Sequence, residues 1–510
     1  LECLRHPPLA EADVMVWLCV AQCFVTLGVC LNMAGHGLTM GFAAILLPQL
    51  DRPDSLIPID ASSGSWIGKG FALVVGNFVV APLMARLGRR TANLVSISPM
   101  LVGWLCTVLA RSVPALLVSR VLQGLSMGMS ASLGPVLVGE YTSPCNRGAF
   151  LTSISLCIAT GVLLVHTMGS YLSWQVTALV CACISFFNLL IVLYSPESPS
   201  WLADRGRYDE CRRVFRWLRP PSEEKELQRM IEASVVARES KVDASASRSL
   251  GKRIGGGVAY FCVTIRKREF YKPIFIMMHI YTLGQWAGAN ILASYTEVIF
   301  HRLIGKDMNV PLLIITLDAQ RIVSNAAAVL VIKKVRRRTM LFSTVGLNVF
   351  SFLATAAYAF FKGRGSLPAA LAHPAVGVLL VHLHMFTIAT GTVPLPFIIA
   401  GELFPLEYRS LAGGISVLFL SGNLFLNVKT MPRLFDSLGI HGAYCIYAAV
   451  VAYCLSVAWF FLPETKDRTL QEIEDEFRGC PLAADAVKSS ESLTAWKLQD
   501  RDRRCSSPVI

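Results

Sequence analysis

The chain carries one eight-residue pattern twice, as EYTSPCNR at residues 140–147 and as ELFPLEYR at residues 402–409. Each copy places a glutamate seven positions before an arginine, with long apolar runs on both sides. Two further motifs repeat: GRR at 88–90 matches RRR at 336–338, and PES at 196–198 matches PET at 463–465. The offsets of 262, 248 and 267 residues are similar, which indicates two copies of one unit. We therefore expect the functional residues to lie where the copies meet.

The composition predicts a membrane protein with many helices. Hydrophobic residues make up 54% of the 510 residues and charged residues 16%, with a mean hydropathy of +0.53. A helix needs about 20 apolar residues to cross the hydrocarbon of a bilayer. Runs of about that length begin near residues 15, 64, 92, 114, 148, 175, 274, 311, 339, 374, 410 and 442. We predict an all-α membrane protein with twelve transmembrane helices in two six-helix halves.

The basic residues indicate how the chain is oriented. The formal net charge is +13, but the Lys and Arg residues crowd alternate loops instead of forming one basic face, which argues against a nucleic-acid partner. By the positive-inside rule these loops and both termini are cytoplasmic. The predicted segments are a first bundle at 1–195, a cytoplasmic linker with short helices at 196–273, a second bundle at 274–462 and a cytoplasmic tail at 463–510.

Several classes of protein are not expected. Most of the fifteen cysteines lie in apolar runs or in cytoplasmic stretches, so we expect no disulfide framework. The sequence has no metal-ligand spacing, no phosphate-binding loop and no catalytic triad, so we predict no catalytic residue, no metal, no cofactor and no enzyme. The first apolar run is too long for a cleavable signal peptide.

Charged residues at the cytoplasmic helix ends predict an ion-pair latch between the two bundles. Each half combines a glutamate and an arginine, seven residues apart, with an arginine-rich turn. Such residues can hold the cytoplasmic side closed and then release it. The alternative is that they only anchor the helix ends at the headgroups. The predicted gate residues are Arg89, Arg90, Glu140, Arg147, Arg337, Arg338, Glu402 and Arg409.

Six ordered motifs carry a family resemblance over nearly the whole chain. They are RVLQG at 120–124, the Glu140 to Gly148 segment, PESPSWL at 196–202, Gln285 with Gly288-Ala-Asn290, residues 401–409 and PETK at 463–466. Together they resemble the sugar porter family of the major facilitator superfamily. Within that family, GLTMGFAAILLPQL at 37–50 resembles the insect facilitated trehalose transporters. The resemblance implies the major facilitator architecture and transport of a sugar across the plasma membrane.

The resemblance also implies which residues bind the sugar. In the family, a Gln-Gln pair and a Gly-x-Asn on the seventh helix hydrogen-bond the sugar hydroxyls. Here Gly284 replaces the first glutamine, whereas Gln285 and Asn290 remain. The fifth helix has Ser155 where the family has glutamine, and the tenth has Phe397 in place of tryptophan.

A sugar is uncharged and rich in donors and acceptors, so its site needs amides, hydroxyls and an aromatic platform. The predicted binding residues are therefore Gln285, Asn290, Tyr295, Phe397 and Ser155. The alternative for each is a helix-packing amide or a core aromatic.

Four ionisable residues lie within the apolar runs: Lys69, Arg120, Asp318 and Arg321. Charge within a membrane is unfavourable and usually paired or functional. Asp318 and Arg321 are three residues apart on one helix, so we expect them to neutralise each other. Lys69 lies a few residues from the outer end of its helix, where its amine can snorkel to the interface or serve the substrate entrance.

Three function classes remain. The leading class is a facilitated (uniport) carrier for trehalose or a hexose that works by alternating access. The others are a proton-coupled or non-sugar solute carrier, and a transport-defective, sensor-like member. Uniport is favoured because proton-coupled relatives have an aspartate where this chain has Ala43, and because Arg321 should keep Asp318 ionised. The third class stays open because Ala85 and Lys333 replace acids of the family's arginine turns. The expected partners are a small-molecule sugar and the lipid bilayer, with a monomeric transport unit.

Overall fold

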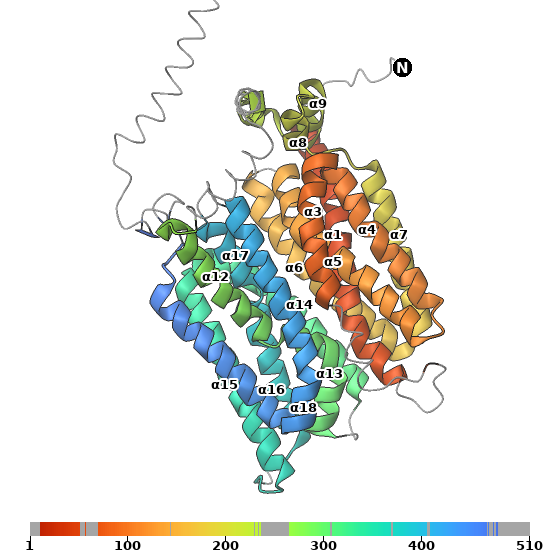
Figure 1. The fold of residues 1–510 in the computed structure, drawn as a ribbon, viewed down its shortest axis with the longest axis vertical. Coiled ribbons are helices and arrows are strands. Elements are labelled where there is room, and N and C mark those ends of the chain that lie inside the picture. Colours follow the sequence, from red (N-terminus) through yellow and green to blue (C-terminus); the bar gives the residue numbers. More distant parts are fainter. Residues whose placement is uncertain are drawn as a thin grey trace, which may run out of the picture.

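The computed structural model describes residues 11–50, 57, 70–142, 144–228, 230–232, 234–235, 265–305, 309–368, 371–404, 409–466, 468, 473 and 476–477. All regular structure in these residues is helical (Figure 1). Nine of the described helices are long and apolar enough to cross a membrane. The prediction of an all-α membrane protein is therefore confirmed, whereas the count of twelve spans stays a prediction.

The described residues of the first half form six helices. They are α1 (Glu11–Leu50), α3 (Gly70–Leu87), α4 (Arg89–Val108), α5 (Val113–Tyr141), α6 (Pro144–Tyr171) and α7 (Trp174–Tyr194). Apolar runs form helices in a bilayer because a helix satisfies its own backbone hydrogen bonds where there is no water. α1 packs on α6 and α7, and α5 packs on α3 and α4. The Phe42 and Trp104 rings meet edge to face in this core, with their centres 5.1 Å apart.

The second half has interrupted helices. It consists of α12 (Arg268–Trp286), α13 (Ala289–Ile304), α14 (Val310–Lys334), α15 (Arg337–Gly363), α16 (Pro374–Thr387), the π-helix η2 (Ile388–Thr392), α17 (Pro394–Leu403) and α18 (Arg409–Phe461). Gly288 separates α12 from α13, and the backbone of α18 leaves helical geometry at Gly439. The expected six spans of this half are obtained if α12 is joined with α13, if α16 is joined with η2 and α17, and if α18 is divided at Gly439.

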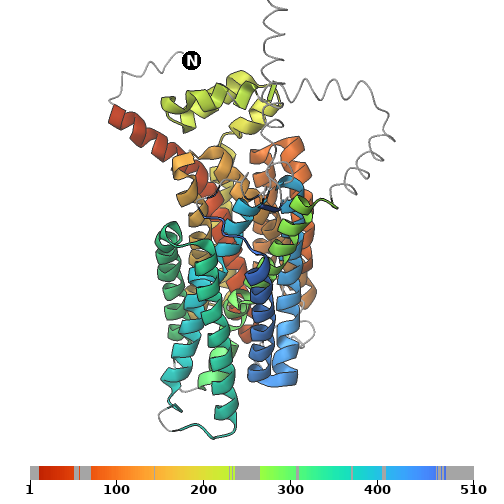
Figure 2. The same cartoon turned by 90° about the vertical axis from the view of Figure 1, so that its left-hand side faces the viewer.

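The two ends of the molecule differ. The short helices α8 (Pro199–Asp204), α9 (Tyr208–Leu218) and η1 (Pro221–Glu223) follow α7, and α8 and α9 lie together at one end (Figures 1 and 2). We call this the linker end, where α3 ends and α4 begins. The opposite end, where α6 ends and α14 begins, is the far end.

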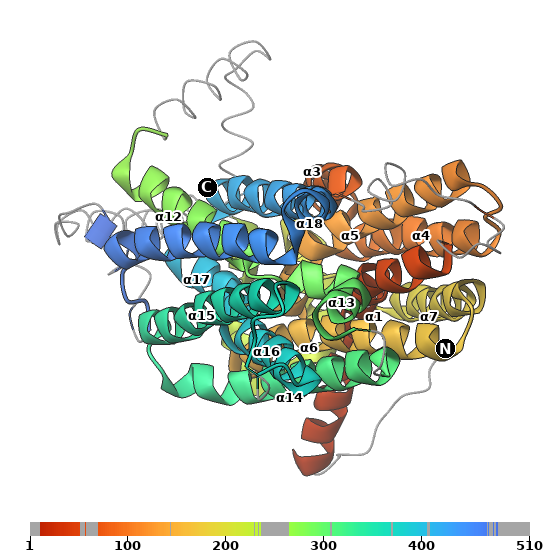
Figure 3. The same ribbon diagram turned by 90° about the horizontal axis from the view of Figure 1, so that it is seen from below.

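Among the described residues, three pairs of helices make the most extensive contacts between the two halves. α6 contacts α14, α3 contacts α18, and α1 contacts α13. Figure 3, viewed from the far end, shows α13 beside α1 where the halves meet. In the α3–α18 contact the Asn77 amide nitrogen donates to the Ser421 hydroxyl at 2.5 Å. The far end is therefore a place where the halves touch.

Candidate functional site

Four residues at the linker end of the first half form a hydrogen-bonded group that we call the first cluster: Arg89, Glu140, Glu197 and Ser198. The Arg89 guanidinium lies 2.9 Å from the Glu140 carboxylate, which also accepts from the Ser198 hydroxyl at 2.5 Å. The Glu197 carboxylate accepts from the backbone N–H groups of Arg89 (2.7 Å) and Arg90 (3.1 Å). These N–H groups open helix α4, where the helix dipole favours a negative charge.

The second half repeats this arrangement in what we call the second cluster: Arg337, Glu402, Glu464 and Thr465. The Arg337 guanidinium lies 3.0 Å from Glu402, which accepts from the Thr465 hydroxyl at 2.6 Å. The Glu464 carboxylate accepts from the backbone N–H groups of Arg337 (2.9 Å) and Arg338 (3.1 Å). Burial alone would raise the pKa of Glu464, but four backbone N–H donors outweigh it and lower that pKa below the ordinary value.

Each cluster lies inside one half. The carboxylates of Glu140 and Glu402 pair with Arg89 and Arg337, which are on neighbouring helices of the same half. The side chains of Arg147 and Arg409 lie outside the described residues, so their predicted pairing is untested. The Arg89–Glu140 and Arg337–Glu402 ion pairs therefore brace each bundle and do not join the bundles. Lys69 and the side chain of Lys333 also lie outside the described residues.

Two further acids complete the clusters and were missing from the predicted gate. Glu197 and Glu464 belong to the repeated PES and PET motifs, which could have indicated them. Arg90 and Arg338 also hold matching places: each donates to a carbonyl near the end of the last helix of its half, Arg90 to that of Leu193 and Arg338 to that of Trp459. The sequence repeat thus extends to the hydrogen bonds.

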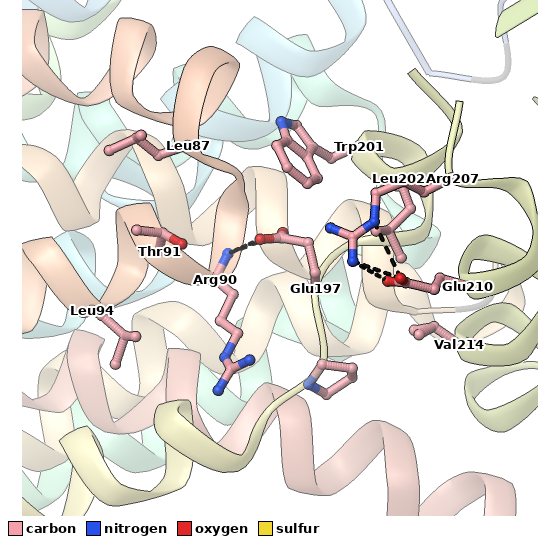
Figure 4. Close-up of a pocket in the computed structure, with 11 residues that line it drawn as sticks. Leu87, Arg90, Thr91, Leu94, Glu197, Trp201, Leu202, Arg207, Glu210 and Val214 are labelled. Atoms are coloured by element: carbon pink, nitrogen blue, oxygen red, sulfur yellow. Dashed lines mark hydrogen bonds and ion pairs between the residues drawn. The ribbon is translucent and has the colours of Figure 1, made fainter. Parts of the chain in front are cut away.

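A cavity of about 430 Å³ lies beside the first cluster (Figure 4). In the figure the backbone nitrogen of Arg90 points at Glu197, and the Arg207 guanidinium faces Glu210, 2.6 Å away. All the lining residues come from the first half and from the segment that follows it. This cavity is therefore not a site between the halves.

Two predicted sugar-binding residues meet in the second half. The Asn290 amide nitrogen donates to the Gln285 side-chain oxygen at 2.5 Å. Gly288, between them, has φ +102°, a left-handed conformation that glycine adopts without a steric penalty. The break ends α12 and lets amides five residues apart come together. This bond uses the Asn290 N–H₂ and the Gln285 side-chain oxygen, and the Gln285 N–H₂ and the Asn290 side-chain oxygen take no part in it.

Gly284 lets α17 approach α12 closely. A Cβ at Gly284 would lie 3.1 Å from both the Pro396 ring and the Thr392 carbonyl oxygen. The position where the family has its first glutamine is therefore packed against η2 and α17 of the same half. The neighbouring Phe397 is 54% exposed, and its ring lies 6.0 Å from that of Tyr281. Phe397 thus has an open face near α12, as an aromatic platform requires.

The other two predicted binding residues are not joined to this pair by the described hydrogen bonds. Ser155 is half-buried on α6, in the first half. Tyr295 packs against the hydrophobic core of the second half, and its backbone leaves helical geometry (φ −132°, ψ 20°). Asn427 on α18, which was not predicted, donates its side-chain N–H to the backbone carbonyl of Gln285 at 3.1 Å. An isolated asparagine in an apolar run gives no signal of that contact.

Arg120 is buried within the first half, at 1% exposure. Its Nη1 donates to the Gln123 side chain at 2.9 Å, and its guanidinium lies 4.9 Å from the centre of the Phe42 ring. Among the described residues its Nε and Nη2 have no hydrogen-bond partner. Cation–π contact and one hydrogen bond therefore hold this charge inside the bundle.

Asp318 and Arg321 do not form a direct ion pair in the described residues, although the carboxylate still acts electrostatically on the guanidinium. Asp318 instead lies against His166 of α6, with 2.5 Å between the Asp318 Oδ2 and His166 Nδ1 atoms. A spacing of three residues puts two side chains on one helix face but does not make them touch. Here α14 packs on α6, so the carboxylate finds its partner across the boundary between the halves.

A family model described as "Sugar (and other) transporter" matches residues 70–477. The facilitated trehalose transporter Tret1 of Apis mellifera ligustica is 26% identical, over 85% of this chain and 83% of that protein. Tret1 of Aedes aegypti is 24% identical over 91% of this chain, but the chain spans only 56% of that relative's length. The mouse solute carrier family 2, facilitated glucose transporter member 8 is 27% identical, over 88% and 93%.

Solved structures share the fold. A proton:xylose symporter, XylE, bound to 6-bromo-6-deoxy-D-glucose, superposes with a TM-score of 0.68 at 18% identity, over 91% of this chain and 99% of that chain. The inward open conformation of XylE from E. coli also gives 0.68, at 16% identity over 89% and 99%. The architecture is that of the major facilitator superfamily. With the family model matching most of its length, the chain belongs to the sugar (and other) transporter family.

Proposed function

We propose that this protein carries a sugar, trehalose or a hexose, across the plasma membrane by facilitated uniport with alternating access. The observation that supports this most is the Gln285–Asn290 amide pair at the break between α12 and α13. Interrupted helices form the binding sites of many transporters, because their freed polar groups face a cavity. An uncharged polyol needs such amides. The trehalose and glucose transporters among the relatives support the same substrate class.

The proposed orientation places the linker end and both termini in the cytoplasm. The basic residues of both clusters and of α9 lie at this end, which agrees with the positive-inside rule. The proposed segments are two bundles, 1–195 and 274–462, with a linker at 196–273 and a tail at 463–510. One chain is the proposed transport unit, with the path running between its halves.

Uniport is proposed on two grounds. Ala43 stands where proton-coupled relatives have an aspartate, so the carboxylate that would load and release a proton is missing there. Asp318, an acid that is present in the apolar runs, contacts His166 across the boundary between the halves. We assign Asp318 to this contact between the halves and not to proton uptake.

The test is uptake into liposomes that contain the full-length chain. We expect saturable uptake of labelled trehalose or glucose, equal flux in both directions at matched gradients, and little response to an imposed proton gradient. L-glucose serves as the control for leakage. Uphill accumulation that a protonophore abolishes would contradict uniport. Saturable transport of an unrelated solute, with no transport of any sugar, would contradict the substrate class.

A further inference from the structure

The halves are joined at a depth between the membrane surfaces by a buried polar contact, His166 with Asp318. His166 lies five residues before the far end of α6, and Asp318 lies eight residues after the start of α14. The two side chains are 2% and 4% exposed. We propose that Asp318 is a gating residue with two alternating partners: His166 while the far end is closed, and Arg321 while it is open. This rests on the proposed alternating-access transport and names residues that set its states.

His166 sits where two helices of each half meet. Its ring lies against Asp318 of α14, and its Nε2 is 3.3 Å from the Ala293 carbonyl oxygen of α13. On the side of α1, a Cβ at Gly41 would come within 3.0 Å of Nε2. A carboxylate and a carbonyl both accept hydrogen bonds, so a ring that is protonated on both nitrogens satisfies both contacts. One imidazole thus ties α6 to two helices of the opposite half.

Separation of the halves at the far end would take the His166 ring away from Asp318. A carboxylate left buried without a partner is strongly destabilising, and more so within a membrane. A cycle that broke this contact without a replacement would therefore stall on the unpaired acid. The structure supplies a replacement on the same helix.

Arg321 is that replacement. It follows Asp318 by three residues on α14, is 4% exposed, and its Nη1 has no hydrogen-bond partner among the described residues. A buried donor without an acceptor is unfavourable. The Arg321 Nη1 group is therefore available to donate to Asp318 when the far end opens. Residues three apart share a helix face, so Arg321 can reach the carboxylate by a change of rotamer. The exchange would keep Asp318 paired in both states.

Two matched substitutions separate this exchange from simple packing. His166→Gln removes the partner of the closed far end, and Arg321→Gln removes the partner of the open far end. Hydrogen–deuterium exchange of the full chain in lipid nanodiscs reports both ends, through peptides of α13 and of residues 40–50 at the far end and peptides around Glu140 and Glu402 at the linker end. Ser170→Ala is the control, because that hydroxyl bonds only the His166 carbonyl of its own helix.

The two variants should shift in opposite directions. We expect His166→Gln to raise exchange several-fold at the far end and to lower it at the linker end, and Arg321→Gln to do the reverse. Shifts in the same direction, a shift in one variant alone, or no shift in either would overturn the proposal. If His166→Gln does not fold, His166→Asn provides the same test. No sugar is needed, so the result stands even if the substrate proves to be another solute.

Discussion

Polar contacts at the two ends of the molecule do different work. At the linker end each half has its own copy of one cluster, with Glu140 in the first and Glu402 in the second, and every contact stays inside its half. Away from the linker end, polar contacts cross between the halves: His166 lies against Asp318 and the Ala293 carbonyl, and Asn77 donates to Ser421. The sequence repeat accounts for the two clusters but not for the His166–Asp318 contact. At the offset that relates Glu140 to Glu402, the counterpart of His166 is Val428.

The difference indicates how a duplicated carrier divides its tasks. Paired charges on neighbouring helices make each half a rigid body, and both halves need this equally, so the cluster is kept twice. The contact that must break during transport lies between the bodies and is needed once. Rigid-body rocking of two bundles around a fixed site is the motion expected of such transporters.

The largest expected effect tests whether the two clusters are equivalent. Arg89→Ala and Arg337→Ala each leave a glutamate without its guanidinium partner, at sites where the paired side chains are 16 to 28% exposed. We expect each to lower the free energy of unfolding by about 1–3 kcal/mol, and by similar amounts. Thermal unfolding in detergent measures this. Arg216→Ala, whose own side chain is 63% exposed beside Glu224, is the control and should have little effect. A large loss of unfolding free energy in only one of the two arginine variants would show that the two clusters are not equivalent.

The next effect concerns the region between the two ends. Gly284→Gln restores the residue type of the family, but its Cβ would crowd Pro396 and Thr392, so we expect overpacking of about 1–3 kcal/mol and weaker sugar binding. Half-saturation of uptake and thermal stability measure the two consequences. Gly346→Gln is the matched control, since a Cβ there meets no atom within 4 Å. Tighter sugar binding by the Gly284 variant would contradict this expectation. It would show that α17 moves to make room and that the introduced glutamine contacts the sugar.

Gln285→Ala and Asn290→Ala should each remove hydrogen bonds to the sugar worth about 0.5–1.5 kcal/mol. A several-fold rise in half-saturation is expected, with normal amounts of protein at the cell surface. The control is Asn309→Ala, because that amide oxygen caps α14 by accepting from the Leu312 N–H at 3.2 Å. Unchanged uptake by both variants would remove this pair from the binding site.

The smallest effect is the pH dependence of the second cluster. The pKa of Glu464 is lowered in the folded state, so its contribution to stability is present above the unfolded pKa of about 4.3 and is lost as pH falls through the folded value. We expect the difference in melting temperature between the wild type and Glu464→Gln to be constant from about pH 7 to 5.5 and to shrink below about pH 4. A difference that already fades near pH 6 would mean that the backbone N–H groups do not hold the charged form.

Much of the fold followed from local sequence, and less of the site did. Apolar runs predicted the helices because the bilayer leaves the backbone no other partners. The repeated motifs placed Arg89, Arg90, Arg337 and Arg338 at helix ends correctly. The partners on other helices were not predicted: Glu140 and Glu402 pair with Arg89 and Arg337, and Asp318 lies against His166. A spacing along the chain says little about contacts between helices.

The sequence by itself determined the class of protein, the duplication and the residue types available to bind an uncharged solute, because composition and period are local properties. Only the tertiary structure decided that Asp318 meets His166 and not Arg321, and that Glu140 meets Arg89. It also decided that Gly284 is a contact surface for α17. These are choices among neighbours on different helices, and the packing of whole helices settles which side chains come within hydrogen-bond distance.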